Sequence, residues 1–197
     1  MQQKETEDMD YEQMSRELRE ICKQKDACTD GYAELLRAKT VPEILSTMKH
    51  HWDFVWSDKY NFRPVIRKYV TKWFAGQEEN FHKAGVYVNE SADRHLAIVT
   101  DTDEILRFGG SVRVYVFGKA HILCYDHCSV FSRCPDAEIE MFDHTSGIVE
   151  HGKVWAYNFA QVQSYQEVTC YNASEVMVNA GIYHDLGHSK LSVYNKE

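Results

Sequence analysis

Residues 117–174 read FGKAHILCYDHCSVFSRCPDAEIEMFDHTSGIVEHGKVWAYNFAQVQSYQEVTCYNAS. A four-residue phrase recurs within this stretch: an aromatic residue, a small polar residue, any residue and a small residue. The phrases are Phe117-Gly118-Lys119-Ala120, Tyr125-Asp126-His127-Cys128, Phe142-Asp143-His144-Thr145, Tyr157-Asn158-Phe159-Ala160, Tyr165-Gln166-Glu167-Val168 and Tyr171-Asn172-Ala173-Ser174. Repetition at a short period indicates units that cannot bury their own apolar faces and must stack on their neighbours, which is typical of a solenoid.

When two degenerate turns are included, Arg133-Cys134-Pro135-Asp136 and Glu150-His151-Gly152-Lys153, the turns follow one another in steps of about eight residues. The residues between them alternate in polarity as short strands do. Two steps make one coil, so equivalent positions are expected to recur at every second step. One column of aromatic residues along an edge of the solenoid then consists of Tyr125, Phe142, Tyr157 and Tyr171. Because so short a coil cannot enclose a ligand, binding surfaces are expected on its outside.

The N-terminal part has helical periodicity instead. A first apolar stripe, at spacings of three and four, consists of Tyr11, Met14, Leu18 and Ile21. Thr40-Val41-Pro42-Glu43 is a capping box that predicts the start of another helix, and a further helix is expected from Asn61 to Gly76. The predicted hinge is 77–80, after which the apolar period changes to two.

The predicted fold is therefore α+β, a small N-terminal helical bundle followed by a short-coil single-stranded β-helix. We expect a helical cap domain over 1–80 and a β-solenoid with a C-terminal cap over 81–197.

Composition restricts the classes of function. The net charge of −8 disfavours a general nucleic-acid binder, since phosphate binding depends on Lys and Arg. No run of about 18 apolar residues indicates a membrane span, and the polar, acidic start does not resemble a signal peptide. These features predict a cytoplasmic location and, for the six cysteines, the reduced state.

The turns carry the main candidate binding site. The pairs Asp126-His127 and Asp143-His144 occupy the same place in the repeat, so adjacent coils should hold them roughly 4.8 Å apart. His127 and His144 are weak candidates for metal ligands, but Asp also stabilises turns by local hydrogen bonds, and we predict no metal and no cofactor. The candidate binding column consists of Tyr125, Asp126, His127, Phe142, Asp143, His144, Tyr157, Asn158, Tyr171 and Asn172.

Two other clusters have a simpler interpretation. Cys124 and Cys128, near His121, have a metal-like composition, but small apolar side chains suit the interior of a narrow coil. Glu138 and Glu140 invite comparison with β-helix enzymes that act on polysaccharides, yet the short coils offer no groove for a paired acid and base, and a solvated strand face is expected.

A basic face is predicted on the third helix, in an otherwise acidic chain. It consists of Arg63, Arg67, Lys68 and Lys72. Such a face can read nucleic acid, bind an anion or an acidic partner, contact the acidic solenoid of the same chain, or merely solvate the helix.

Three short sequences carry a resemblance to a known group. They are Cys28-Thr29-Asp30-Gly31-Tyr32, Ala38-Lys39-Thr40 and the strand sequence Gly85-Val86-Tyr87-Val88. Together with the short Tyr-Asx turns, they resemble uncharacterised single-stranded β-helix proteins of gut Bacteroidales and their prophages. The resemblance covers most of the chain and implies the solenoid fold, but it transfers no catalytic residue and no activity.

No nucleophile, base and oxyanion-binding group can be assembled from these motifs. The sequence therefore favours a non-enzymatic binding or protein-interaction module with a protein partner. The alternatives are a carbohydrate-binding or carbohydrate-active β-helix, and a phage or host regulatory protein that acts through the basic helix 61–75. An uncapped coil end or a bare Tyr face also allows pairing with a second copy of the chain.

Overall fold

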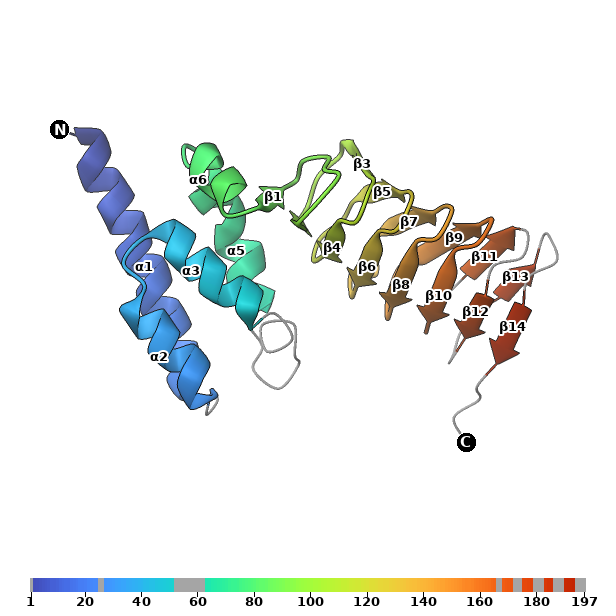
Figure 1. Ribbon diagram of the computed structural model, residues 1–197, viewed down its shortest axis with the longest axis horizontal. Helices are drawn as coiled ribbons and strands as arrows, with labels where there is room; N and C mark the ends of the chain where they lie inside the picture. Colours follow the sequence, from blue (N-terminus) through green and yellow to red (C-terminus); the bar gives the residue numbers. More distant parts are fainter. Residues whose placement is uncertain are drawn as a thin grey trace. The chain divides into compact units, whose positions relative to one another are not determined.

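The computed structural model describes residues 2–24, 27–51, 63–165, 168–171, 175–178, 183–185 and 190–193. The chain divides into two compact units, Met1–Val86 and Tyr87–Glu197. The first is helical, and the second is built of parallel strands that form a β-solenoid of about five turns (Figure 1). The predicted α+β class is thereby confirmed.

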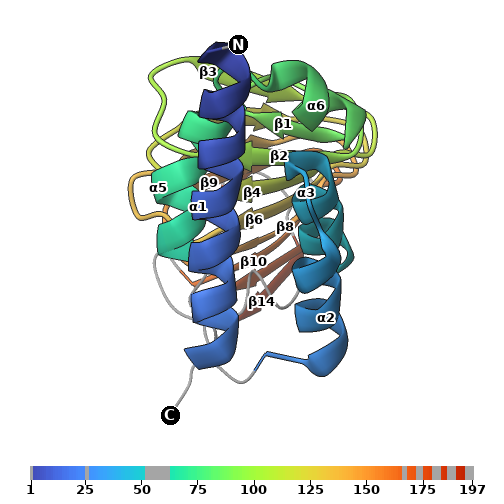
Figure 2. The ribbon, with the colours of Figure 1, turned by 90° about the vertical axis from the view of Figure 1, so that its left-hand side faces the viewer.

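The helices of the first unit pack against one another. α1 contacts α2 and α5, and α3 contacts α2 and α6 (Figure 2). Their bounds are α1 Gln2–Gln24, α2 Thr29–Arg37, α3 Val41–His50, α5 Arg63–Phe74 and α6 Glu78–Lys83. The apolar stripes predicted from the sequence form the core of this unit, whose most deeply buried side chains include Met14, Leu18, Ile44, Ile66 and Val70.

The capping box at the start of α3 forms with one difference from the expected pattern. Thr40 Oγ1 accepts a hydrogen bond from Glu43 N (3.4 Å), while the Glu43 carboxylate accepts one from Lys39 N (2.6 Å) instead of from the Thr40 amide. Two amides at the helix start are satisfied in either arrangement, so the signal locates the helix correctly.

The predicted hinge at 77–80 is wrong as a description of local structure. Gly76 has a φ of 82° and ends the preceding turn, but Glu78 then begins α6. Phe81 is fully buried and its ring meets Phe74 edge-on, with 5.3 Å between centroids. The burial of Phe81 thus holds α6 in place, and this helix is too short to show a periodic pattern of apolar residues in the sequence.

The solenoid consists of two parallel sheets whose strands alternate along the chain. Sheet A has the order β1-β2-β4-β6-β8-β10-β12-β14, and sheet B has the order β13-β11-β9-β7-β5-β3. The strands are β1 Val86–Val88, β2 Leu96–Val99, β3 Ile105–Phe108, β4 Arg113–Val116, β5 His121–Cys124, β6 Ser129–Ser132, β7 Glu138–Met141, β8 Ser146–Val149, β9 Lys153–Tyr157, β10 Gln161–Ser164, β11 Val168–Tyr171, β12 Glu175–Val178, β13 Tyr183–Asp185 and β14 Lys190–Val193.

The register confirms the coil length expected from the turn phrases. Ser129, which follows the Tyr125 phrase, pairs with Ser146, which follows the Phe142 phrase, and Gln161 pairs in the same way with Glu175. Inward positions of both sheets form one continuous core, in which Cys124 and Ala156 are fully buried. Mostly small and β-branched side chains fill this narrow interior.

Candidate functional site: a column of stacked rings

The turns that lead from sheet B to sheet A share an unusual backbone conformation. In three of these turns the second residue of the phrase has a positive φ: 58° at Asp126, 55° at Asp143 and 56° at Asn158. The turn is closed by hydrogen bonds such as Cys128 N to Tyr125 O (3.3 Å). Asp and Asn tolerate this left-handed conformation better than other non-glycine residues, which explains the Asx at this position.

The Asp side chains also join one coil to the coil before it. Asp126 Oδ2 accepts a hydrogen bond from Gly110 N (2.8 Å), and Asp143 Oδ2 accepts one from Asp126 N (3.4 Å). Each carboxylate therefore satisfies a turn amide of the preceding coil. The geometry therefore supports a turn-forming role for Asp126 and Asp143.

The first residues of the phrases form an inner ladder of rings. Tyr125 and Phe142 stack with 4.9 Å between centroids and 11° between ring planes, and Phe142 and Tyr157 stack at 4.5 Å and 5°. These side chains are half-buried. The predicted column exists as far as Tyr157; Tyr171 continues it in backbone register, but its side chain and Asn172 lie outside the described part of the chain.

The third residues of the phrases form an outer ladder, which we define as His127, His144 and Phe159. The centroids of His127 and His144 are 5.4 Å apart, and those of His144 and Phe159 are 5.2 Å apart, with planes inclined by 11° in each pair. All three side chains are exposed, and Phe159 has 59% of its surface accessible. Sequence reasoning placed the histidines in one column but missed Phe159, which occupies the same place in the repeat.

The fourth residues point into the core. Cys128 and Thr145 are fully buried, Cys128 Sγ donates to Gly109 O (3.4 Å) and Thr145 Oγ1 donates to Cys124 O (3.3 Å). Burial raises the pKa of the Cys128 thiol to about 11 and that of Cys124 well above its ordinary value. The prediction that Cys124 and Cys128 pack in the interior is confirmed.

The residues considered as metal ligands have other roles in the structure. His127 and His144 stack on each other, and His121 Nε2 lies 2.8 Å from Glu140 Oε1 on the outside of sheet B. Across the described residues, no group of three or more His, Cys, Asp or Glu side chains is placed to hold a metal ion. Glu140 thus has His121 as a side-chain partner, whereas the sequence predicted only a solvated strand face.

The basic face lies on α5, as its sequence pattern predicts. Arg67, Lys68 and Lys72 are exposed, and Lys68 Nζ lies 4.5 Å from the centroid of the Tyr69 ring. The Arg63 side chain lies outside the described part. A role of this face in binding stays a prediction.

A shallow groove on the outer face of sheet A was not predicted. It has a volume of about 370 Å³, and apolar Phe131, Ile148 and Met177 lie among polar Ser129, Ser146, Gln161 and Gln163. Ile148 and Met177 are more than one third exposed. The signal was available in the sequence, because Tyr115, Phe131 and Ile148 occupy the outward position of successive strands in register.

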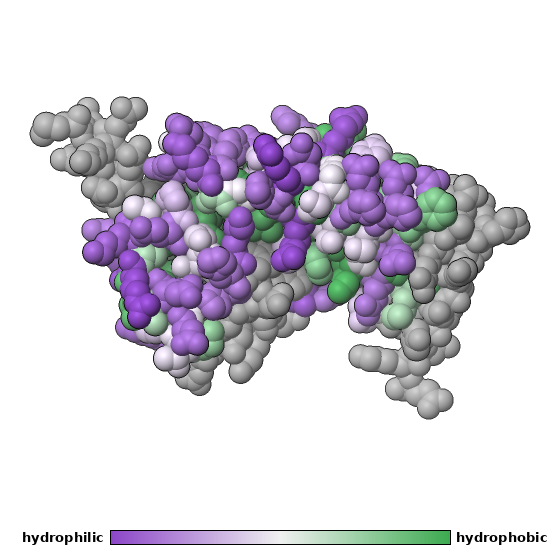
Figure 3. Space-filling model, in the orientation of Figure 1, coloured by the Kyte–Doolittle hydropathy of each residue, from purple (hydrophilic) through white to green (hydrophobic). Residues whose placement is uncertain are grey.

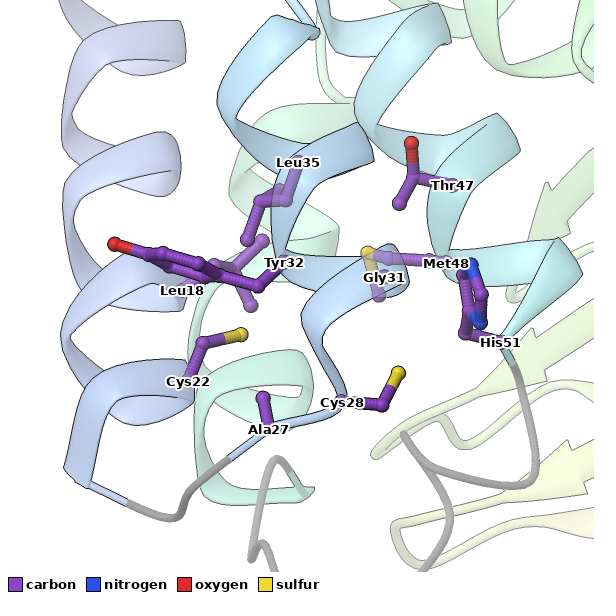
Figure 4. Close-up of a pocket in the computed structure, with 10 residues that line it drawn as sticks. All are labelled: Leu18, Cys22, Ala27, Cys28, Gly31, Tyr32, Leu35, Thr47, Met48 and His51. Atoms are coloured by element: carbon purple, nitrogen blue, oxygen red, sulfur yellow. The ribbon is translucent and has the colours of Figure 1, made fainter.

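The helical unit contains a small apolar pocket between α1, α2 and α3 (Figure 4). Its volume is about 40 Å³, whereas pockets for small-molecule ligands have roughly 300 Å³ or more. Cys28 and His51 lie on the same side of it, where a Cβ on Gly31 would be 3.1 Å from the thiol and 3.3 Å from the imidazole ring. His51 Nε2 also lies 3.3 Å from Glu34 Oε2. The pocket is a packing gap beside the contact between His51 and Glu34.

The surface character of the chain is mainly hydrophilic on the face drawn in Figure 3, where hydrophobic residues form small, separate areas. None of the described helices has the length and apolar character needed to cross a bilayer. No family model, curated protein or solved structure matches this chain.

Proposed function

We propose that the chain is a non-enzymatic protein-interaction module that binds a protein partner through the turn column of its solenoid. The observation that carries this proposal is the outer ladder. His127, His144 and Phe159 are exposed, yet each is held by stacking at 5.2–5.4 Å on the next. An exposed row of aromatic rings in fixed positions is a recognition surface whose members need no ordering when a partner binds.

The energetics of interfaces favour these residues. Aromatic side chains are enriched among the few residues that dominate binding energy, and an exposed Phe has apolar area to bury. The carboxylates of Asp126 and Asp143 accept hydrogen bonds from turn amides, and this use supports a structural role for the acids and a contact role for the rings.

The resemblance to solenoid proteins of gut Bacteroidales and their prophages directs the search for the partner. A bacterial protein is accordingly the proposed ligand, and a lysate of gut Bacteroidales is the source in which to look for it.

The experiment is affinity capture with the immobilised full-length chain. Wild type is compared with a variant in which the outer ladder is removed by His127→Ser, His144→Ser and Phe159→Ser. The matched control carries Ser at three exposed positions on the outside of sheet B: Ile105, Glu138 and Lys153. Circular dichroism verifies that all three proteins retain the fold.

The proposal predicts a protein that wild type and the control capture and the ladder variant does not. If every protein captured by wild type is captured equally by the ladder variant, the turn column is not the binding surface.

A second candidate function has its own observation. The groove on sheet A combines an aromatic ring, Phe131, with the amides of Gln161 and Gln163 and the hydroxyls of Ser129 and Ser146. Rings and neutral hydrogen-bonding groups of this kind suit a carbohydrate, as the alternative reading of the sequence suggests. Screening of the full-length chain on a glycan array, with Gln161→Ala/Gln163→Ala as the test variant, distinguishes this function. Oligosaccharide binding that the variant loses would favour it over a protein partner.

A further inference from the structure

Tyr125 is the first ring of the inner ladder in chain order, and the coil before it has no ring at the equivalent position. Phe108 pairs with Cys124 in sheet B, so the position that corresponds to Tyr125 in the preceding coil is Gly109. Among the described residues, Phe142 is the only ring that stacks on Tyr125. One face of the Tyr125 ring therefore stacks on Phe142, and the opposite face lies on the side of Gly109.

An open hollow lies over this glycine. Its volume is about 600 Å³, and its lining includes Tyr87, Ser91, Asp93, Arg107 and Tyr125, with Gly109 at the missing position. All of these residues belong to the solenoid unit. The ladder rings repeat at 4.5–4.9 Å, so the next place in the series falls within this hollow.

Gly109 lies close to the Asp126 side chain of the following coil. A Cβ on Gly109 would lie 3.3 Å from Asp126 Oδ2, the oxygen that accepts the hydrogen bond from Gly110 N. A side chain at 109 would require that carboxylate to shift by a small amount. With glycine at this position, the first place of the ladder carries no ring.

Arg107 supplies a charge at the same hollow. Its backbone N donates to Ser91 Oγ (2.9 Å), which fixes the backbone from which the side chain projects. The side chain is exposed, and within the described ranges its guanidinium forms no ion pair. The nearby carboxylate of Asp93 lies instead 3.7 Å from Arg94 Nε.

We propose that this hollow receives an aromatic side chain of the protein partner, which stacks on the free face of Tyr125 as the next rung of the ladder. Arg107 then binds a carboxylate that the partner carries next to that ring, since Arg binds carboxylates strongly through paired N–H groups. The inference rests on the proposed function, because it names the chemistry of the partner at one end of the same column.

The direct test is an NMR titration of the full-length chain. The probes are N-acetyltryptophan, which has a ring and a carboxylate, N-acetyltryptophanamide, which has the ring alone, and methyl glucoside. We expect both tryptophan probes to shift the amide signals of Gly109 and Gly110, with tighter binding of the acid. Arg107→Gln should abolish the difference between the two probes.

Two variants block the ring site in different ways. Tyr125→Leu removes the stacking surface and should weaken binding of the tryptophan probes about tenfold. Gly109→Phe places a ring of the chain itself in the hollow and should have the same effect. Tyr165→Leu, a half-exposed tyrosine in a turn that leads from sheet A to sheet B, is the matched control and should leave binding unchanged.

The outcomes separate the inference from the proposed function. No shift at Gly109 with either tryptophan probe, or a stronger response to methyl glucoside, overturns it. The captured partner should also bind Tyr125→Leu and Gly109→Phe more weakly than wild type. If both variants capture the partner normally while the outer-ladder variant does not, the interaction module stands and the ring site is refuted.

Discussion

Phe142 and Tyr157 stack with 4.5 Å between ring centroids and 5° between ring planes, although they belong to successive coils of the chain. The spacing is close to the separation of hydrogen-bonded strands, so the two backbones hold the rings in contact without adjustment. The same relationship recurs at Tyr125 and Phe142. The ladder is therefore a direct consequence of placing an aromatic residue at the same position of successive coils.

Replacing the central ring should destabilise the solenoid. Phe142→Ala removes two stacking contacts and a half-buried apolar surface, with an expected loss of about 2 kcal/mol in the free energy of unfolding. Phe142→Tyr keeps the ring and should change stability by less than about 0.5 kcal/mol. Urea denaturation followed by circular dichroism measures both. An alanine variant as stable as wild type would mean that the ladder does not contribute to folding.

A graded series at Asp126 should separate backbone conformation from hydrogen bonding. Asn keeps both the tolerance of a positive φ and the acceptor for Gly110 N, so Asp126→Asn should be nearly neutral. Gly loses the acceptor alone, at a cost of about 1 kcal/mol, and Ala loses both, at about 2 kcal/mol. The midpoint of urea unfolding should fall in the order Asn, Gly, Ala. Equal stability of the Gly and Ala variants would show that the backbone strain is not important.

Two glycines of the solenoid should respond differently to alanine. A Cβ at Gly118 would clash with the backbone N of Asp101, in the preceding coil, so Gly118→Ala should cost about 3 kcal/mol or more. At Gly147 the closest atom is Met141 Cε, at 3.0 Å, which is the end of a flexible side chain, and the expected cost is about 1 kcal/mol. Thermal unfolding of the two variants compares them. The reverse order would contradict the described coil spacing.

Stability should fall in alkaline solution because of buried Cys128. Burial raises its pKa from 9.0 to about 11, so between these values the unfolded chain loses the thiol proton while the folded chain keeps it. The contribution is complete below pH 9 and decreases through pH 11, by at most about 1.4 kcal/mol per pH unit. Cys128→Thr, which copies the buried Thr145 of the next coil, should show a smaller decrease over this range. Identical pH profiles for the two proteins would refute the assignment.

Much of the solenoid could be predicted because one signal repeats. An Asx residue marks three of the described turns from sheet B to sheet A. The regular step between turns gives the strands, their alternation between two sheets and the register of Tyr125, Phe142 and Tyr157. The burial of Cys124 and Cys128 followed from the narrowness of so short a coil. In each case, many equivalent residues point to the same structure.

Features that depend on a single residue or on an absence were harder to predict. α6 rests on the burial of Phe81 and has no periodicity to detect. The outer-ladder role of Phe159 differs from the histidine pattern before it, and the hollow at Gly109 arises where the aromatic phrase is missing. The pairing of His121 with Glu140 joins positions on adjacent strands that are not direct register partners, a diagonal contact that depends on side-chain length.

Hydroxyl-radical footprinting of the chain with its captured partner tests the central claim most directly, since it reports the exposure of individual side chains. The partner should protect His127, His144 and Phe159 and leave Ile148 and Met177, on the outer face of sheet A, as reactive as in the free chain. Protection of Ile148 and Met177 with an unchanged outer ladder would contradict the account and place the binding surface on sheet A.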